Sequence, residues 1–141
     1  MSRRPQPILW FERLILGALA IDLASNLYFA DDIAKRWAAT GVALNGPGLV
    51  ALCLSSPALG LLLWYLVAQR RNNFGRWLMA ILVALATFGF VVAIVRATAT
   101  SAPTILVVAG VSEIMKIVAV AMLFTEEASR WFSAGRAGRQ P

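Results

Sequence analysis

Four polar side chains lie inside apolar stretches of this sequence, where ionisable groups are energetically costly. The segment GVSEIMKIVAV carries Glu113 and Lys116 three residues apart, which places them on one face of a helix. A second apolar stretch, LILGALAIDLASN, carries Asp22 and Asn26. Two carboxylates and one amine can share or exchange a proton, and ionisable groups within a membrane are candidates for function. We therefore define a candidate intramembrane polar cluster of Asp22, Asn26, Glu113 and Lys116.

The residues that most other chemistry requires are missing. The sequence contains no histidine and a single cysteine, Cys53. This excludes an intrachain disulfide, zinc sites built from Cys and His, and Ser-His-Asp triads. Ser112 and Lys116 are four residues apart and could form a Ser–Lys pair, but no other residue supports an oxyanion site. We therefore expect no enzymatic activity, no metal and no cofactor.

Composition indicates where these residues lie. The chain of 141 residues is 60% hydrophobic and 14% charged, against about 45–50% and about 25% in soluble proteins. This predicts a single integral membrane domain over residues 1–141. Four runs approach the roughly 20 residues that cross a bilayer, at about 14–30, 49–68, 77–95 and 105–124. We expect an all-α membrane protein with a four-transmembrane-helix up-down bundle.

Two short amphipathic stretches flank these runs and predict helices that lie in the membrane interface. DDIAKRWAATG starts at Asp31 and reaches Gly41, and TEEASRWFSAG starts at Thr125 and reaches Gly135. Acidic or hydroxyl residues favour helix starts and glycine favours helix ends. The alternative for the second stretch is a simple continuation of the fourth run.

Inside the second run, Pro57 predicts a kink, with Ser55 and Ser56 helping to satisfy the carbonyls that proline leaves free. Small residues on the first and fourth runs would let helices approach closely. These small residues are Gly17, Ala20, Ala24, Ala109 and Gly110.

The basic residues predict an orientation, because cytoplasmic loops carry an excess of Lys and Arg. One side of a four-span chain would carry Arg3, Arg4, Arg13, Arg70, Arg71, Arg76, Arg130, Arg136 and Arg139. The other side would carry only Lys35, Arg36 and Arg96. We expect both termini in the cytoplasm, and a net charge of +6 that sets orientation and binds no nucleic acid. Aromatic residues should anchor the same cytoplasmic edge, namely Trp10, Trp64, Tyr65, Trp77 and Trp131.

Insertion energies separate the four runs into two pairs. A central charge costs about 2.5–3.5 kcal/mol, so Glu113 and Lys116 together cost about 5–7 kcal/mol. The fourth run is therefore marginal, and the first run is marginal because of Asp22 and Asn26. First and last helices of an up-down bundle are neighbours. We expect these two helices to pack face to face, with Lys116 between Asp22 and Glu113.

Two segments together, RRNNFGRWLM and AMLFTEEASRWF, resemble parts of small bacterial inner-membrane proteins of four spans that have no assigned function. The resemblance implies a multi-pass protein of the bacterial inner (plasma) membrane. Asp22 in LILGALAIDLASN also resembles the acid in the first span of small multidrug resistance exporters. That family has a glutamate there, shorter chains and no Glu/Lys pair in its fourth span, so the resemblance implies only a functional analogy.

Two functions follow as hypotheses. The first is a non-catalytic scaffold or accessory subunit whose partners are the lipid bilayer and either further copies of itself or a larger membrane complex. In that case the polar cluster is a structural clasp that fixes helix register. The alternative is a small proton-coupled transporter or channel that uses Asp22 and Glu113 as its titrating groups.

Overall fold

The computed structural model describes residues 5–70, 72–97 and 103–137, and within these ranges the chain forms helices and no strand. Six α-helices follow one another, and a π-helical turn continues the third of them. In chain order they are α1 Gln6–Tyr28, α2 Ala30–Ala39, α3 Gly46–Trp64, η1 Tyr65–Gln69, α4 Asn73–Ala97, α5 Pro103–Leu123 and α6 Glu126–Ala137.

Three helical segments are long and apolar enough to span a bilayer: Gly46–Gln69, Asn73–Val95 and Thr104–Leu123. They correspond to the second, third and fourth predicted runs, so the structure identifies the chain as an all-helical membrane protein. The first predicted run is not among the spanning candidates of the described residues. Its helix, α1, is 23 residues long and begins at Gln6, which brings Glu12 and Arg13 into the same helix as Asp22.

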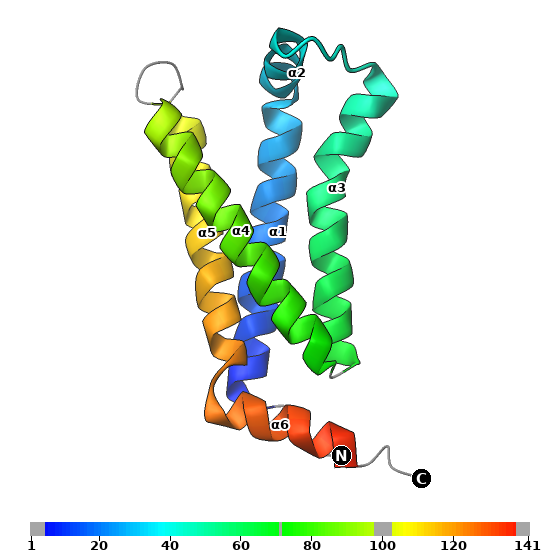
Figure 1. The fold of residues 1–141 in the computed structure, drawn as a ribbon, viewed down its shortest axis with the longest axis vertical. Coiled ribbons are helices and arrows are strands. Elements are labelled where there is room, and N and C mark those ends of the chain that lie inside the picture. Colours follow the sequence, from blue (N-terminus) through cyan, green and yellow to red (C-terminus); the bar gives the residue numbers. More distant parts are fainter. Residues whose placement is uncertain (1–4, 71, 98–102, 138–141) are drawn as a thin grey trace.

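Figure 1 shows α1 at the centre of the bundle, between α5 and α3. The most extensive packing joins α1 to α5, and α4 packs against α5. The helices α3 and α4 meet close to the turn that joins them and then diverge (Figure 1). The short helix α2 lies at the opposite end of the bundle from α6, which crosses the bundle end at a steep angle (Figure 1).

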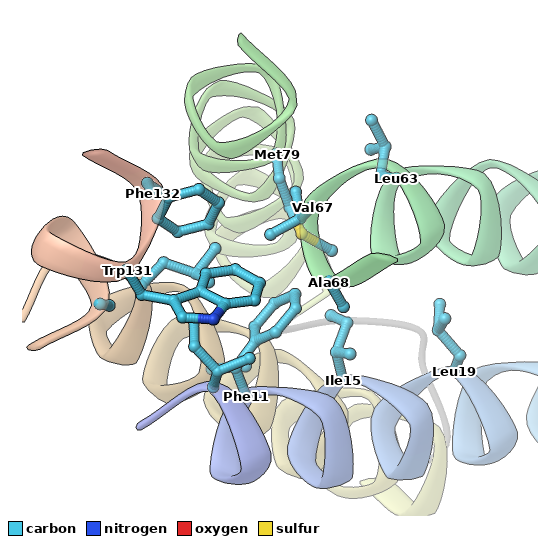
Figure 2. Packing of buried hydrophobic residues seen from close by; sticks show 13 residues of the cluster. Phe11, Ile15, Leu19, Leu63, Val67, Ala68, Met79, Trp131 and Phe132 are labelled. Carbon is cyan, nitrogen blue, oxygen red and sulfur yellow. The ribbon is translucent and has the colours of Figure 1, made fainter. Parts of the chain in front are cut away.

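The apolar core gathers at the α6 end of the bundle. On α1 it uses one face, with Ile8, Phe11, Ile15 and Leu19 all buried at the spacings of three and four residues that align side chains on a helix. Figure 2 shows the facing side chains, which come from α3, η1, α4 and α6 and include Leu63, Val67, Met79, Trp131 and Phe132. The core also includes Ala119 and Leu123 of α5, so it ties six segments together at one end and leaves the α2 end more open.

The helix α6 belongs to this core, a contact that was not predicted for a stretch expected either to lie in the membrane interface or to continue the fourth run. Trp131 is only 8% exposed and packs edge-on against Phe132, so its side chain is part of the core. The Arg76 guanidinium of α4 lies 4.1 Å from the ring centroid of Phe124 and donates to Ser129 Oγ at 3.3 Å. The aromatic pattern of α6 is thus explained by packing.

One of the two predicted glycine stops, Gly41 and Gly135, ends its helix in the structure. Gly41 follows α2 with φ of 86°, a left-handed conformation that glycine adopts without strain, so this stop is confirmed. The predicted stop at Gly135 is wrong, because α6 continues to Ala137. The apolar contacts of Trp131 and Phe132 already hold that helix against the bundle, and a single glycine costs only about 1 kcal/mol within a helix.

Candidate intramembrane polar site

Lys116 on α5 lies between two carboxylates. Its Nζ is 2.9 Å from Oδ2 of Asp22 on α1 and 3.1 Å from Oε2 of Glu113 on its own helix. The side chains of Lys116 and Asp22 keep 17% and 16% of their surface exposed, and that of Glu113 keeps 7%. The predicted packing of the first run against the fourth is therefore present, with the amine placed between the acids.

Two hydroxyls complete the shell around the acids. Ser112 Oγ hydrogen-bonds Asp22 Oδ1 and lies 3.3 Å from the Ala18 carbonyl. Thr87 Oγ1 of α4 lies 2.6 Å from Glu113 Oε1 and 2.9 Å from the Val83 carbonyl. A hydroxyl has one proton to donate, so it cannot donate to both neighbours at once. When it donates to the carbonyl, its oxygen can accept a hydrogen bond from a protonated carboxyl, and the shell therefore accommodates either protonation state of the acids.

Thr87 was not identified from the sequence. A threonine in the middle of an apolar run is common, and its role depends on the depth at which α4 packs against α5. The available signal was that Thr87 is the one hydroxyl residue within the run at residues 77–95. Ser112 was considered only as part of a Ser–Lys pair, but its hydroxyl contacts Asp22 and its side chain is fully buried.

Asn26 has a different partner from the other three predicted residues. Its Nδ2 donates to the Cys53 carbonyl on α3 at 3.1 Å, and the Cys53 thiol donates to the Asn26 carbonyl at 3.5 Å. Cys53 lies four residues before Pro57, so proline removes the N–H that would otherwise bond this carbonyl. Asn26 therefore supplies the lost donor. We expected Ser55 and Ser56 to compensate, but Ser55 Oγ donates to the Leu52 carbonyl.

Close helix contacts position the cluster. A Cβ at Gly17 would lie 2.9 Å from the terminal methyl of Met115, which brings α1 and α5 together one turn from Asp22. A Cβ at Gly60 would overlap a methyl group of Leu19, which sets the distance between α1 and α3. Gly17 thus allows the close helix approach that the sequence predicted, and Gly60 allows a similar approach between α3 and α1.

Two hollows reach Asp22 from different directions. The first, called here the α2-end cavity, has a volume of about 210 Å³ and is lined by Asp22, Ser25, Asn26, Asp32 and Arg36 among others. The second, called the lateral cleft, lies between α3 and α4, with a volume of about 380 Å³. Asp22 lines both hollows, Lys116 lines the lateral cleft, and Glu113 is not part of either wall in the described chain.

Within residues 5–70, 72–97 and 103–137, no three His, Cys, Asp or Glu side chains gather in a way that could hold a metal ion. Comparisons of the chain with protein-family models, with curated proteins and with solved structures gave no match. The two resemblances stated from the sequence therefore stay predictions. The geometry of the site is that of a carboxylate, Asp22, that is held by an amine and reached from two hollows.

Proposed function

We propose that α1 is a fourth transmembrane span in a multi-pass protein of the bacterial inner membrane. Its 23 residues extend about 34 Å at about 1.5 Å per residue, and the hydrocarbon core is about 30 Å thick. Asp22 is paired with Lys116 inside the bundle, and Glu12 and Arg13 lie in the first half of α1. In this topology Arg13, Arg70 and Arg130 share one side, which the positive-inside rule assigns to the cytoplasm.

For the function of this bundle, the geometry favours a small, non-enzymatic, proton-coupled transporter in which Asp22 exchanges protons. The observation that carries the proposal is that one carboxylate, Asp22, lines both the α2-end cavity and the lateral cleft. A group that is to load a proton from one direction and release it in another must face both. Ionisable residues inside a membrane bundle are typical of proton pathways.

The other cluster residues have distinct parts in this proposal. Lys116 bonds both acids, so it keeps Asp22 in position and links it to Glu113. Glu113 is nearly buried and bonded by Thr87, which suits a site that stores the shared proton but does not meet the cavities directly. A proton that leaves Asp22 can be replaced by one from the Lys116 ammonium, and a protonated Glu113 then reprotonates the amine. Glu113 regains its proton by the reverse of this path when Asp22 is next loaded from a hollow.

The test is proton flux into proteoliposomes that hold a pH-sensitive dye, driven by a potassium diffusion potential. We expect flux with the wild type, no flux with Asp22→Asn, and flux reduced by about tenfold or more with Glu113→Gln. Glu127→Gln is the matched control, because Glu127 is an exposed acid on α6 away from the cluster. A wild-type protein that conducts no protons, or an Asp22→Asn variant that conducts them normally, would refute the transporter.

A non-catalytic scaffold or accessory subunit is the second candidate, and a specific observation favours it. Both carboxylates and the amine already have partners, so the cluster can act as a clasp that fixes α1 on α5. In that case the wild type should conduct no protons. A triple variant with Asp22→Leu, Glu113→Leu and Lys116→Leu should fold with little loss of stability. This outcome would assign the cluster a structural role in a homo-oligomer or a larger membrane complex.

A further inference from the structure

The lateral cleft is built from four helices and is not explained by proton exchange alone. Its walls are mostly apolar and include Leu59 and Leu63 of α3 and Met79 and Val83 of α4, with Ser55 and Ser56 of α3 as the polar exceptions. Its floor carries Asp22 of α1 and Lys116 of α5. The volume of about 380 Å³ lies within the roughly 300–1,000 Å³ of small-molecule sites, which are mostly apolar with a few polar groups.

Residues of α3 and α4 line the cleft on opposite sides, and these two helices diverge from the end at which they meet (Figure 1). Residues on its rim are exposed, with Leu59 at 47%, and Ser55 and Ala86 are exposed as well. Because α3 and α4 are both candidate membrane spans, this opening faces the hydrocarbon of the bilayer. A molecule that occupies the cleft must therefore enter from the lipid and be soluble in it.

The floor offers one hydrogen-bond donor to such a molecule. A lysine ammonium has three N–H donors, and two of those on Lys116 point to Asp22 and Glu113. Among the described residues no further protein acceptor bonds the third donor, while the side chain is 17% exposed and lines the cleft. A donor left unpaired in an apolar site is costly, and an acceptor on a ligand removes that cost.

The charges select the class of ligand. The Lys116 amine already faces two carboxylates, so an anion would meet their repulsion. A cation would have to displace Lys116 from Asp22 before it could pair with that acid. A carbonyl oxygen accepts an N–H and adds no charge. Lys116 also lies well inside α5, away from its ends at Pro103 and Leu123, whereas the ester carbonyls of phospholipids lie near the bilayer surface.

We infer that the lateral cleft binds a neutral, membrane-dissolved molecule with an apolar body and a carbonyl oxygen, such as a quinone or a ketone, and that the oxygen accepts from Lys116. This site goes beyond proton transport and does not require it. The apolar body fills the space between α3 and α4, and the carbonyl fixes its depth at the polar cluster.

Benzophenone is a suitable probe, because it is neutral and apolar, has one carbonyl and attaches to nearby C–H groups on illumination. We expect the full-length protein in lipid nanodiscs to be labelled at cleft residues, with Met79 among them. Decylubiquinone should compete with the label, and diphenylmethane, which lacks the carbonyl, should compete about tenfold or more weakly, as expected for loss of a hydrogen bond from a charged donor. Equal competition by diphenylmethane, or stronger competition by the cation tetraphenylphosphonium, would overturn the ligand class.

A pair of variants tests the location. Ala86→Phe places a ring in the lateral cleft without altering Asp22 or Lys116, and Ala84→Phe adds the same ring at an exposed position of α4 outside the cleft lining. Labelling should disappear in Ala86→Phe and persist in Ala84→Phe. Labels spread evenly over the lipid-facing residues, with no difference between the variants, would show that the cleft is filled only by ordinary lipid. Labelling does not depend on a proton gradient. A protein without proton flux would therefore refute only the transporter, and labels spread evenly over the lipid-facing residues would refute only the ligand site.

Discussion

Each polar residue of the sequence-defined cluster bonds a different helix or a second charge. Asp22 and Lys116 join α1 to α5, Glu113 meets Thr87 of α4, and Asn26 meets α3. A polar group that is buried without a partner costs several kcal/mol, so the groups that oppose insertion of α1 and α5 also select their neighbours. At the scale of residues, specificity of packing comes from these few contacts.

Asn26 and Pro57 should be energetically coupled. Asn26→Ala leaves the Cys53 carbonyl without its donor and should lower the free energy of unfolding by about 1–2 kcal/mol. In a Pro57→Ala background the backbone N–H of residue 57 can bond the same carbonyl, so the further loss on Asn26→Ala should fall below about 1 kcal/mol. Unfolding in a denaturing detergent gives the free energy of unfolding of the wild type, the two single variants and the double variant. Ser55→Ala is the control, with little expected effect, and equal losses in both backgrounds would contradict the coupling.

Lys116→Met should be the most damaging single change in the cluster. It removes the amine between Asp22 and Glu113 and leaves two buried carboxylates facing each other, which costs about 3–5 kcal/mol when one partner of a buried pair is lost. Combining it with Asp22→Asn and Glu113→Gln should recover most of that loss. The same detergent unfolding provides the measurement. A single variant as stable as the wild type would show that the acids do not depend on the amine.

At the scale of elements, the sequence predicts most of the helices. It does not predict the contacts that depend on how far one helix is shifted along its neighbour. The three longest apolar runs became helices near their predicted bounds, and the spacing of Glu113 and Lys116 with the cost of insertion pointed to Asp22. Thr87 could not be assigned, because its contact depends on how far α4 slides along α5. The docking of α6 was missed because an aromatic residue such as Trp131 has the same pattern in a core as in an interface.

Glycine positions test the spacing between elements. Gly60→Ala should lower stability by about 1–3 kcal/mol, because the new methyl overlaps Leu19 and pushes α3 from α1. In a Leu19→Ala background the same substitution should cost nothing further. Gly89→Ala on α4 is the matched control, since no atom of the described chain lies within 4 Å of the added Cβ, and a helical Gly→Ala change is favourable by up to about 1 kcal/mol. Similar effects at both sites would show that close packing does not set the α1–α3 distance.

At the scale of the whole molecule, the bundle is closed at one end and open toward the other. The core shared by α1, α3, η1, α4, α5 and α6 holds the closed end, while α3 and α4 diverge and leave the lateral cleft beside the polar cluster. A chain of this size buries few side chains completely, so it can keep such an opening only if its ends are firmly joined. Arg76 and the α6 aromatics perform that joining, which leaves Asp22 accessible without loss of the fold.

The membrane topology depends on whether α1 crosses. If it does, residues 6 and 127 lie on one side of the bilayer and residue 40 lies on the other. If only α3, α4 and α5 cross, residues 6 and 40 share a side and residue 127 lies opposite. Single cysteines at Gln6, Thr40 and Glu127, in a Cys53→Ala background, can be tested with a membrane-impermeant maleimide added outside intact cells. We expect only Thr40→Cys to react before the cells are opened, because the basic residues place the ends of α1 and α6 inside. Detergent should make all three reactive, and joint labelling of positions 6 and 40 in intact cells would reduce the protein to three spans.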